Sequence, residues 1–154
     1  IIYRNYKKNI NISTLISIKN YCKKNKINFF ISNNVNLAVK YQLDGVYIPA
    51  FNKQINYMRF LLPINFKIIG SAHNNREILI KEKQGCNIIF LSPIFKVKKK
   101  NSFLNIIKFN FLTLNKKIKF VALGGINNKN LNKLNLLNIC GYAGISYFQK
   151  KTAS

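Results

Sequence analysis

Groups that bind phosphate recur directly after the short apolar runs of this 154-residue chain. They comprise an arginine, a lysine run, hydroxyl groups and a Gly-Gly pair: Arg4, Ser32, Ser71, Lys96, Lys98, Lys99, Lys100, Gly124, Gly125 and Ser146. Backbone N–H groups of a glycine turn bind anions, and Lys and Arg side chains add positive charge. The pattern predicts a site for a phosphorylated small molecule.

Carboxylate chemistry has few candidates. Three acidic residues, Asp44, Glu77 and Glu82, stand against 26 basic ones. This chain lacks the acidic residues that a pair of catalytic carboxylates, an EF-hand or a carboxylate-rich two-metal site would need. The one histidine, His73, could act as a general base, but its place just after Ser71 favours a supporting hydrogen bond.

The formal net charge of +23 has two interpretations. Clustered basic residues bind polyanions, so a nucleic-acid partner is one of them. The other is a bias toward A+T-rich codons, because 24 Ile, 23 Lys and 25 Asn are inflated together and Asn adds no charge. The lysines are scattered along the chain, which favours the codon bias and makes nucleic acid the less favoured partner.

The number and spacing of the cysteines and the hydropathy of the chain indicate the cellular compartment. Cys22, Cys86 and Cys140 have no metal-ligand spacing, and an odd number of cysteines is typical of a reducing environment. We expect each of them to be buried. Since no apolar run reaches the length of a membrane span, we expect a cytoplasmic protein that does not cross a membrane.

The hydrophobic pattern repeats one unit, a short β-branched or aromatic run followed by a helical pattern. The pattern predicts strands over 1–4, 27–32, 46–48, 66–70, 87–92, 118–123 and 143–147. It predicts helices over 13–25, 35–42, 76–84, 102–112 and 129–138, with Gly141 in a turn before the last strand.

Continuous apolar runs are typical of parallel strands that are covered on both faces. Seven such units without a break in strand order favour a (β/α)8 TIM-type barrel that lacks the first βα unit, over a single domain of residues 1–154. No G-x-G-x-x-G follows the first strand, which argues against dinucleotide binding. A homo-oligomer or an unseen N-terminal segment could cover the strand edges of such an incomplete barrel.

The chain resembles the thiamine phosphate synthase/TenI family of (β/α)8 barrels. The segments that carry the resemblance are Ile31-Ser-Asn-Asn-Val-Asn-Leu-Ala38, Asp44-Gly-Val-Tyr47, Gly70-Ser-Ala-His73, Ser92-Pro-Ile-Phe95, Val121-Ala-Leu-Gly-Gly-Ile126 and Gly144-Ile-Ser146. The resemblance implies coupling of hydroxymethylpyrimidine diphosphate to thiazole phosphate, which gives thiamine phosphate and pyrophosphate. It implies that small phosphorylated molecules are the substrates.

The resemblance also implies roles for individual residues. Arg4 and Ser71 would contact the diphosphate, and Lys100 would neutralise the charge that develops on it. The thiazole phosphate would bind at the last two strand ends. The expected catalytic residues are Arg4 and Lys100, and the expected substrate-binding residues are Ser32, Ser71, Lys98, Lys99, Gly124, Gly125, Ile145 and Ser146.

Two positions where the family carries magnesium-binding aspartates hold Asn33 and Asn52. Amide oxygens could bind Mg²⁺ weakly at these positions, or the lysines of 96–100 could supply the missing positive charge. The family's tautomerase branch has its catalytic histidine where this chain has Pro93, which favours the synthase branch. The main alternative is a non-catalytic relative that binds thiamine phosphate or a phosphorylated precursor, and a nucleic-acid-binding protein is the third hypothesis.

Overall fold

The computed structural model describes residues 1–5, 10–55, 62–97 and 102–144. Within these residues, seven strands form one sheet in chain order, and each neighbouring pair is parallel. They are β1 (Ile2–Tyr3), β2 (Phe30–Ser32), β3 (Gly45–Ile48), β4 (Lys67–Ala72), β5 (Ile88–Leu91), β6 (Lys119–Leu123) and β7 (Gly141–Ala143). The carboxyl ends of all seven strands therefore lie along one edge of the sheet.

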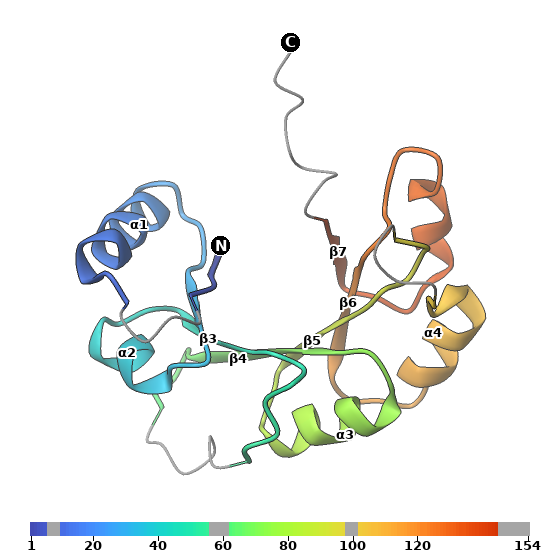
Figure 1. Ribbon diagram of the computed structural model, residues 1–154, viewed down its shortest axis with the longest axis horizontal. Helices are drawn as coiled ribbons and strands as arrows, with labels where there is room; N and C mark the ends of the chain where they lie inside the picture. The colour runs from blue at the N-terminus through green and yellow to red at the C-terminus, as the bar shows by residue number, and fades with distance from the viewer. Residues whose placement is uncertain (6–9, 56–61, 98–101, 145–154) are drawn as a thin grey trace.

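The helices cover the outer face of the sheet (Figure 1). They are α1 (Ile12–Lys24), α2 (Val35–Lys40), α3 (Asn75–Lys83), α4 (Asn105–Thr113) and the short 3-10 helix η2 (Leu131–Leu136). Three of these helices have an asparagine N-cap. The side chains of Asn11, Asn34 and Asn74 accept hydrogen bonds from first-turn N–H groups. The Asn-rich composition thus supplies the helix caps.

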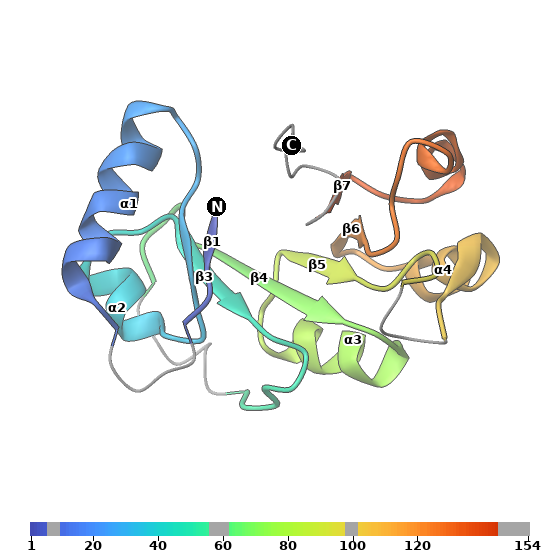
Figure 2. The ribbon, with the colours of Figure 1, turned by 45° about the horizontal axis from the view of Figure 1, so that its top comes forward.

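The sheet curls into an arc, with β1 at one end and β7 at the other (Figure 2). Strand residues that face the helices, such as Val46 and Ile89, pack with α3 and α4 side chains in the largest apolar core. On the concave face, Phe30, Tyr47 and Ile69 form a smaller cluster. The seven parallel strands thus make a curled half-barrel of the TIM-like α/β type.

The predicted order of strands and helices is confirmed, with two corrections near the end of the chain. The helix predicted over 129–138 is a six-residue 3-10 helix, Leu131–Leu136. The side chains of Asn127 and Asn130 hydrogen-bond to the Gly125 carbonyl, and such local bonds compete with an α-helix. The last strand that the structure describes is Gly141–Ala143, so Gly141 lies inside the strand and not in a turn. Residues 145–147 of the predicted strand 143–147 lie outside the described residues.

Two expectations about burial and membranes can also be compared with the structure. Cys22 and Cys86 are buried as predicted, but Cys140 is exposed, and its thiol donates to the Phe120 carbonyl at the edge of β6. The prediction of a buried cysteine was wrong there, because Cys140 directly precedes β7, which has β6 as its one strand neighbour in the described part of the chain. In the part of the chain that the structure describes, every helix is too short or too polar to span a membrane.

Replacing Gly45 by alanine is expected to destabilise the protein strongly. A Cβ atom at Gly45 would lie 1.9 Å from the Lys67 carbonyl oxygen on the adjacent strand β4, so the strand pair would have to separate. We expect the free energy of unfolding in urea to fall by about 2–3 kcal/mol.

Gly141→Ala is the matched control, because a Cβ there meets no atom within 4 Å. Its unfolding free energy should stay within about 0.5 kcal/mol of the wild type. Equal losses in the two variants would show that the close approach of β3 and β4 is not the constraint.

Candidate functional site

The carboxyl edge of the sheet gathers most of the predicted site residues that the structure describes. Arg4 follows β1, Ser32 ends β2, and Asn33 comes directly after it. Asn52 lies in the loop after β3, and Ser71 is the penultimate residue of β4. Ser32, Asn52 and Ser71 are buried, so these polar side chains are held inside the fold and are not on a freely solvated surface.

A chain of contacts joins Arg4 to Ser71 through Tyr47. The Arg4 guanidinium carbon lies 4.8 Å from the centre of the Tyr47 ring, which is a cation–π contact. The Tyr47 hydroxyl donates to Ser71 Oγ at 2.9 Å, and the Tyr47 ring packs edge-on against Phe90. Since Ser71 Oγ accepts this bond, its own proton can be donated to a ligand oxygen.

The side chains of Asn33 and Asn52 hydrogen-bond to each other across the ends of β2 and β3, with Asn52 Nδ2 donating to Asn33 Oδ1. Asn33 has a positive φ of 62°, a conformation that asparagine adopts more readily than most residues. Asn52 Oδ1 accepts from the backbone N–H of Gln54 at 2.8 Å. The two side chains therefore lie together beyond the carboxyl ends of β2 and β3.

A buried lysine contacts the backbone of Asn52. Lys81 of α3 is fully buried, and its Nζ donates to the Asn52 carbonyl and to Gln84 Oε1, both at 2.8 Å. Burial lowers the pKa of Lys81 from 10.5 to about 8, although the Cys86 thiol and the Glu77 carboxylate act in the opposite direction. Burial likewise raises the pKa of the Cys86 thiol to about 12.

Sequence reasoning missed Lys81 and Gln84. The signal was present, because Lys81 lies three residues after the buried Ile78 on a nine-residue helix and so falls on its apolar face. A lysine at such a position is expected to find a buried hydrogen-bond partner. The partner, a carbonyl 29 residues earlier in the chain, was beyond any local pattern.

The Gly124-Gly125 turn packs against the loop that follows β5. Both glycines have positive φ values, and a Cβ at Gly125 would lie 2.6 Å from the Phe95 carbonyl oxygen. The Gly124 carbonyl accepts from the Phe95 N–H, and the Gly125 carbonyl accepts from the Asn127 and Asn130 side chains. In a trans peptide the N–H points opposite to the C=O, so the N–H groups of Gly125 and Ile126 point away from these partners.

His73 has a supporting place, as expected. Its Nδ1 lies 2.7 Å from the Ser92 carbonyl oxygen, so Nδ1 carries the proton and donates. Its backbone N–H donates to the Glu77 carboxylate at 2.7 Å. These two bonds tie the end of β4 to the end of β5 and to the start of α3.

The remaining predicted residues lie outside the described ranges. They are Lys98, Lys99, Lys100, Ile145 and Ser146. Lys96 is described, and its carbonyl oxygen would lie 2.7 Å from a Cβ at Gly125. The start of the lysine run therefore borders the glycine turn.

Comparison with known proteins identifies the family. Residues 1–148, nearly the whole chain, match the family described as thiamine monophosphate synthase. The chain belongs to this family. It is 34% identical over 121 residues to the thiamine-phosphate synthase of Prochlorococcus marinus strain SARG, and 29% identical over 136 residues to thiamine-phosphate synthase 1 of Streptococcus pneumoniae strain R6.

The chain spans only part of these relatives. It covers 35% of the Prochlorococcus protein and 64% of the Streptococcus protein, while 77% and 85% of this chain is matched. The fold is similar to that of the thiamine phosphate pyrophosphorylase from Pyrococcus furiosus, with a TM-score of 0.70 and 22% identity over 90% of this chain and 69% of that one. At this identity the likeness shows the fold alone.

The magnesium expected from the family resemblance does not fit the side chains that this member has at Asn33 and Asn52. Magnesium sites in proteins use one or two carboxylates together with waters and substrate oxygens. Asn33 and Asn52 are neutral, their Oδ1 atoms already accept hydrogen bonds, and the Lys81 ammonium contacts the Asn52 carbonyl. Among the described residues, no three His, Cys, Asp or Glu side chains group as metal ligands.

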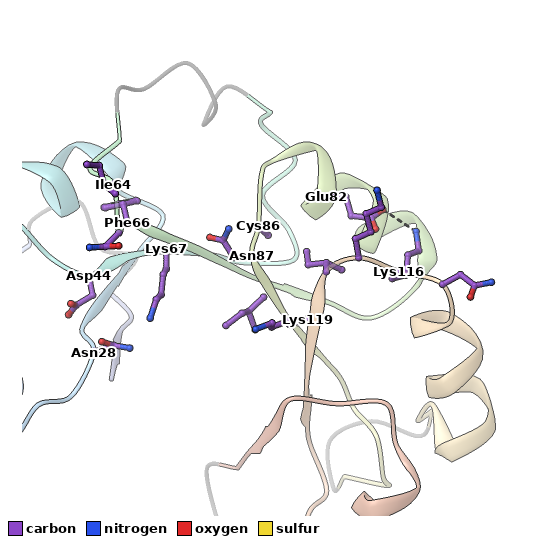
Figure 3. A pocket seen from close by; sticks show the side chains of 15 residues that line it. Asn28, Asp44, Ile64, Phe66, Lys67, Glu82, Cys86, Asn87, Lys116 and Lys119 are labelled. Carbon is purple, nitrogen blue, oxygen red and sulfur yellow. Dashed lines mark hydrogen bonds and ion pairs between the residues drawn. The ribbon is translucent and has the colours of Figure 1, made fainter.

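A large hollow lies at the opposite, amino-terminal edge of the sheet (Figure 3). Its volume is about 1190 Å³, and it is lined by the first residues of β4, β5 and β6. Lys67 and Lys119 line it, and Lys116 pairs with Glu82 at 3.0 Å. None of the predicted site residues that the structure describes lines this hollow, so it is separate from that part of the candidate site.

The burial of Lys81 predicts a pH dependence of stability. Because the folded protein lowers this pKa to about 8, the unfolded chain binds more protons between pH 8 and 10.5. The cost of burying the charge is fully present below pH 8 and is lost as the pH rises to 10.5. We expect the difference in unfolding free energy between wild type and Lys81→Met to rise by about 3 kcal/mol over this interval.

Urea unfolding of both proteins from pH 7.5 to 10.5 measures this difference, since the exposed lysines and tyrosines titrate equally in the two. A difference that does not change with pH would mean that Lys81 keeps its ordinary pKa in the folded protein.

Proposed function

We propose that this chain carries out the coupling step of thiamine phosphate synthesis. It would transfer the hydroxymethylpyrimidine group from its diphosphate to the nitrogen of thiazole phosphate, and so act as a transferase on small phosphorylated substrates. The observation that carries the proposal is the family match over residues 1–148, together with the contact chain from Arg4 through Tyr47 to Ser71.

In the proposed reaction, the bond between the pyrimidine methylene carbon and the diphosphate oxygen breaks, and the electron pair leaves with pyrophosphate. The thiazole nitrogen then attacks the resulting pyrimidine cation, which needs no proton transfer. The protein's task is to hold two anions and to stabilise the negative charge that develops on the leaving group. The scarcity of acidic residues is compatible with this task.

Arg4 and Ser71 would hold the diphosphate. The Tyr47 ring fixes the Arg4 guanidinium at the carboxyl edge, and the Tyr47 hydroxyl orients the Ser71 hydroxyl. The guanidinium then faces the charge that grows on the leaving oxygen, and the Ser71 proton is donated to a phosphate oxygen. Lys98, Lys99 and Lys100 would add positive charge from the loop after β5, and Ser32 would line the same edge.

The thiazole phosphate would bind at the Gly124-Gly125 turn. The N–H groups of Gly125 and Ile126 point away from the partners of the neighbouring carbonyls, so they can donate to a phosphate. Ile145 and Ser146 would complete this end of the site. Lys96 borders the same turn through its carbonyl group.

A non-catalytic relative that binds thiamine phosphate is the second candidate. The observation that favours it is the direct bond between Asn33 and Asn52 at positions where the resemblance implies carboxylates. Such a protein would keep the phosphate contacts of Ser71 and Gly125 but would not release pyrophosphate. Turnover separates the two candidates.

We propose further that the half-barrel is part of a closed (β/α)8 barrel. The sequential parallel order and the curl of the sheet support this, as does the TM-score of 0.70 to a structure of which the chain covers 69%. In the described part of the chain, β1 and β7 each have one strand neighbour. A homo-oligomer would cover such edges.

The test is formation of thiamine phosphate from the pyrimidine diphosphate and thiazole phosphate, with and without Mg²⁺. Wild type should form product, and Ser71→Ala should lower kcat/KM by about 10- to 100-fold, because one hydrogen bond to a charged group is lost. Ser17→Ala is the matched control, since Ser17 is an exposed residue of α1, and it should keep full activity.

Absence of product from folded wild type, together with calorimetric binding of thiamine phosphate, would replace the synthase proposal by the second candidate. Equal activity of Ser71→Ala and Ser17→Ala would remove Ser71 from the proposed site.

A further inference from the structure

The ends of β2 and β3 are joined by the hydrogen bond between the Asn33 and Asn52 side chains, where a divalent cation was expected. We infer that this chain has replaced a cation site by a metal-free amide clasp, made of Asn33, Asn52, Lys81 and Gln84. The inference deepens the proposed function, and it rests on that function for the identity of the anion bound beside the clasp, the diphosphate.

The charges explain why asparagine is favoured at both position 33 and position 52 once it is present at one of them. Two carboxylates at hydrogen-bond distance repel each other unless a proton or a cation lies between them. Two amides attract, since one NH₂ group donates to the other carbonyl oxygen. Asn33 and Asn52 therefore hold the two strand ends together with no ion.

Lys81 supplies a fixed positive charge to the clasp. Its stem passes β4 at Gly70, where an added Cβ would lie 2.8 Å from both Lys81 Cδ and Cys86 Sγ. Only a residue without a side chain leaves room there, so Gly70 and Lys81 fit each other. The side chain then reaches the Asn52 carbonyl in the loop after β3 at 2.8 Å.

Gln84 completes the clasp. Its Oε1 accepts from Lys81 Nζ, while its Nε2 donates to the Asn52 carbonyl at 3.0 Å and to the Gln54 carbonyl at 2.7 Å. Both Lys81 and Gln84 are fully buried, so these bonds are shielded from water. Lys81 and Gln84 thereby fix the loop after β3 at the Asn52 and Gln54 carbonyls.

The electrostatic consequence is a preference for an anion over a divalent cation beside Asn52. A divalent cation beside Asn52 would be repelled by the Lys81 ammonium behind it, whereas a diphosphate would be attracted. Glu77 is the acidic group of α3 that interacts with Lys81, and its carboxylate already accepts from the His73 N–H. The clasp therefore provides the positive charge that a metal would otherwise bring.

Thermal unfolding in EDTA and in Mg²⁺ tests the inference without any activity measurement. Wild type should have the same Tm in both solutions, because an ion that does not bind the folded state cannot stabilise it. The Asn33→Asp/Asn52→Asp variant should melt several degrees lower in EDTA and recover in Mg²⁺. Asn20→Asp/Asn132→Asp is the matched control, with the same added charge at exposed positions, and should respond little to Mg²⁺.

A wild-type Tm that rises in Mg²⁺ as much as that of the Asn33→Asp/Asn52→Asp variant would overturn the inference. So would a Tm of that variant that is insensitive to Mg²⁺, because the clasp would then not occupy a potential cation site.

Adding Lys81→Met to the double variant separates electrostatics from packing. If Lys81 acts through its charge, the triple variant should reach half of its Tm increase at a several-fold lower Mg²⁺ concentration. A merely structural role would lower the Tm in both solutions and leave this concentration unchanged, which would remove Lys81 from the clasp.

Titration of wild type with inorganic pyrophosphate links the clasp to the proposed function. Binding in EDTA supports the inference, and binding that requires Mg²⁺ overturns it. If pyrophosphate binds in neither solution, the proposed function loses its diphosphate site, and the Tm measurements still decide whether the clasp is metal-free.

Discussion

The parallel pairing of seven strands in chain order is the constraint on which the rest of the molecule depends. Each strand of this sheet ends at the same edge, so residues as far apart as Arg4 and Gly125 lie along one line of strand ends. At the amino ends of β3 and β4 the two strands approach so closely that the Lys67 carbonyl leaves no room for a Cβ at Gly45. Loops that follow different strands can therefore contribute residues to one site.

The two sides of the sheet have different tasks. On the convex side, apolar strand residues and helix residues form the main core. Lys81, a charged residue, is fully buried beside them. On the concave side, Tyr47 packs with Phe30 and Ile69 and directs its hydroxyl to Ser71. The core and the candidate site therefore share the same strands, because neighbouring residues of one strand face opposite sides.

The composition of the chain also has structural consequences. Asparagine caps α1, α2 and α3, forms the pair at the ends of β2 and β3, and hydrogen-bonds the glycine turn. In a chain with three acidic residues, amide side chains supply the acceptors at these helix caps and strand ends. Neutral amides satisfy backbone groups without adding charge, but they cannot hold a divalent cation as strongly as carboxylates do.

The sequence by itself determined the order of strands and helices, the parallel sheet, and the family, because continuous apolar runs and short motifs such as Gly70-Ser-Ala-His73 are local signals. It also indicated that Arg4, Ser71 and Gly125 lie at strand ends. It did not determine that residues 131–136 form a 3-10 helix, because side chains of Asn127 and Asn130 compete with the backbone there. Only the tertiary structure decided that Lys81 reaches Asn52, since that contact depends on how α3 packs over Gly70 and on the room that a missing Cβ leaves.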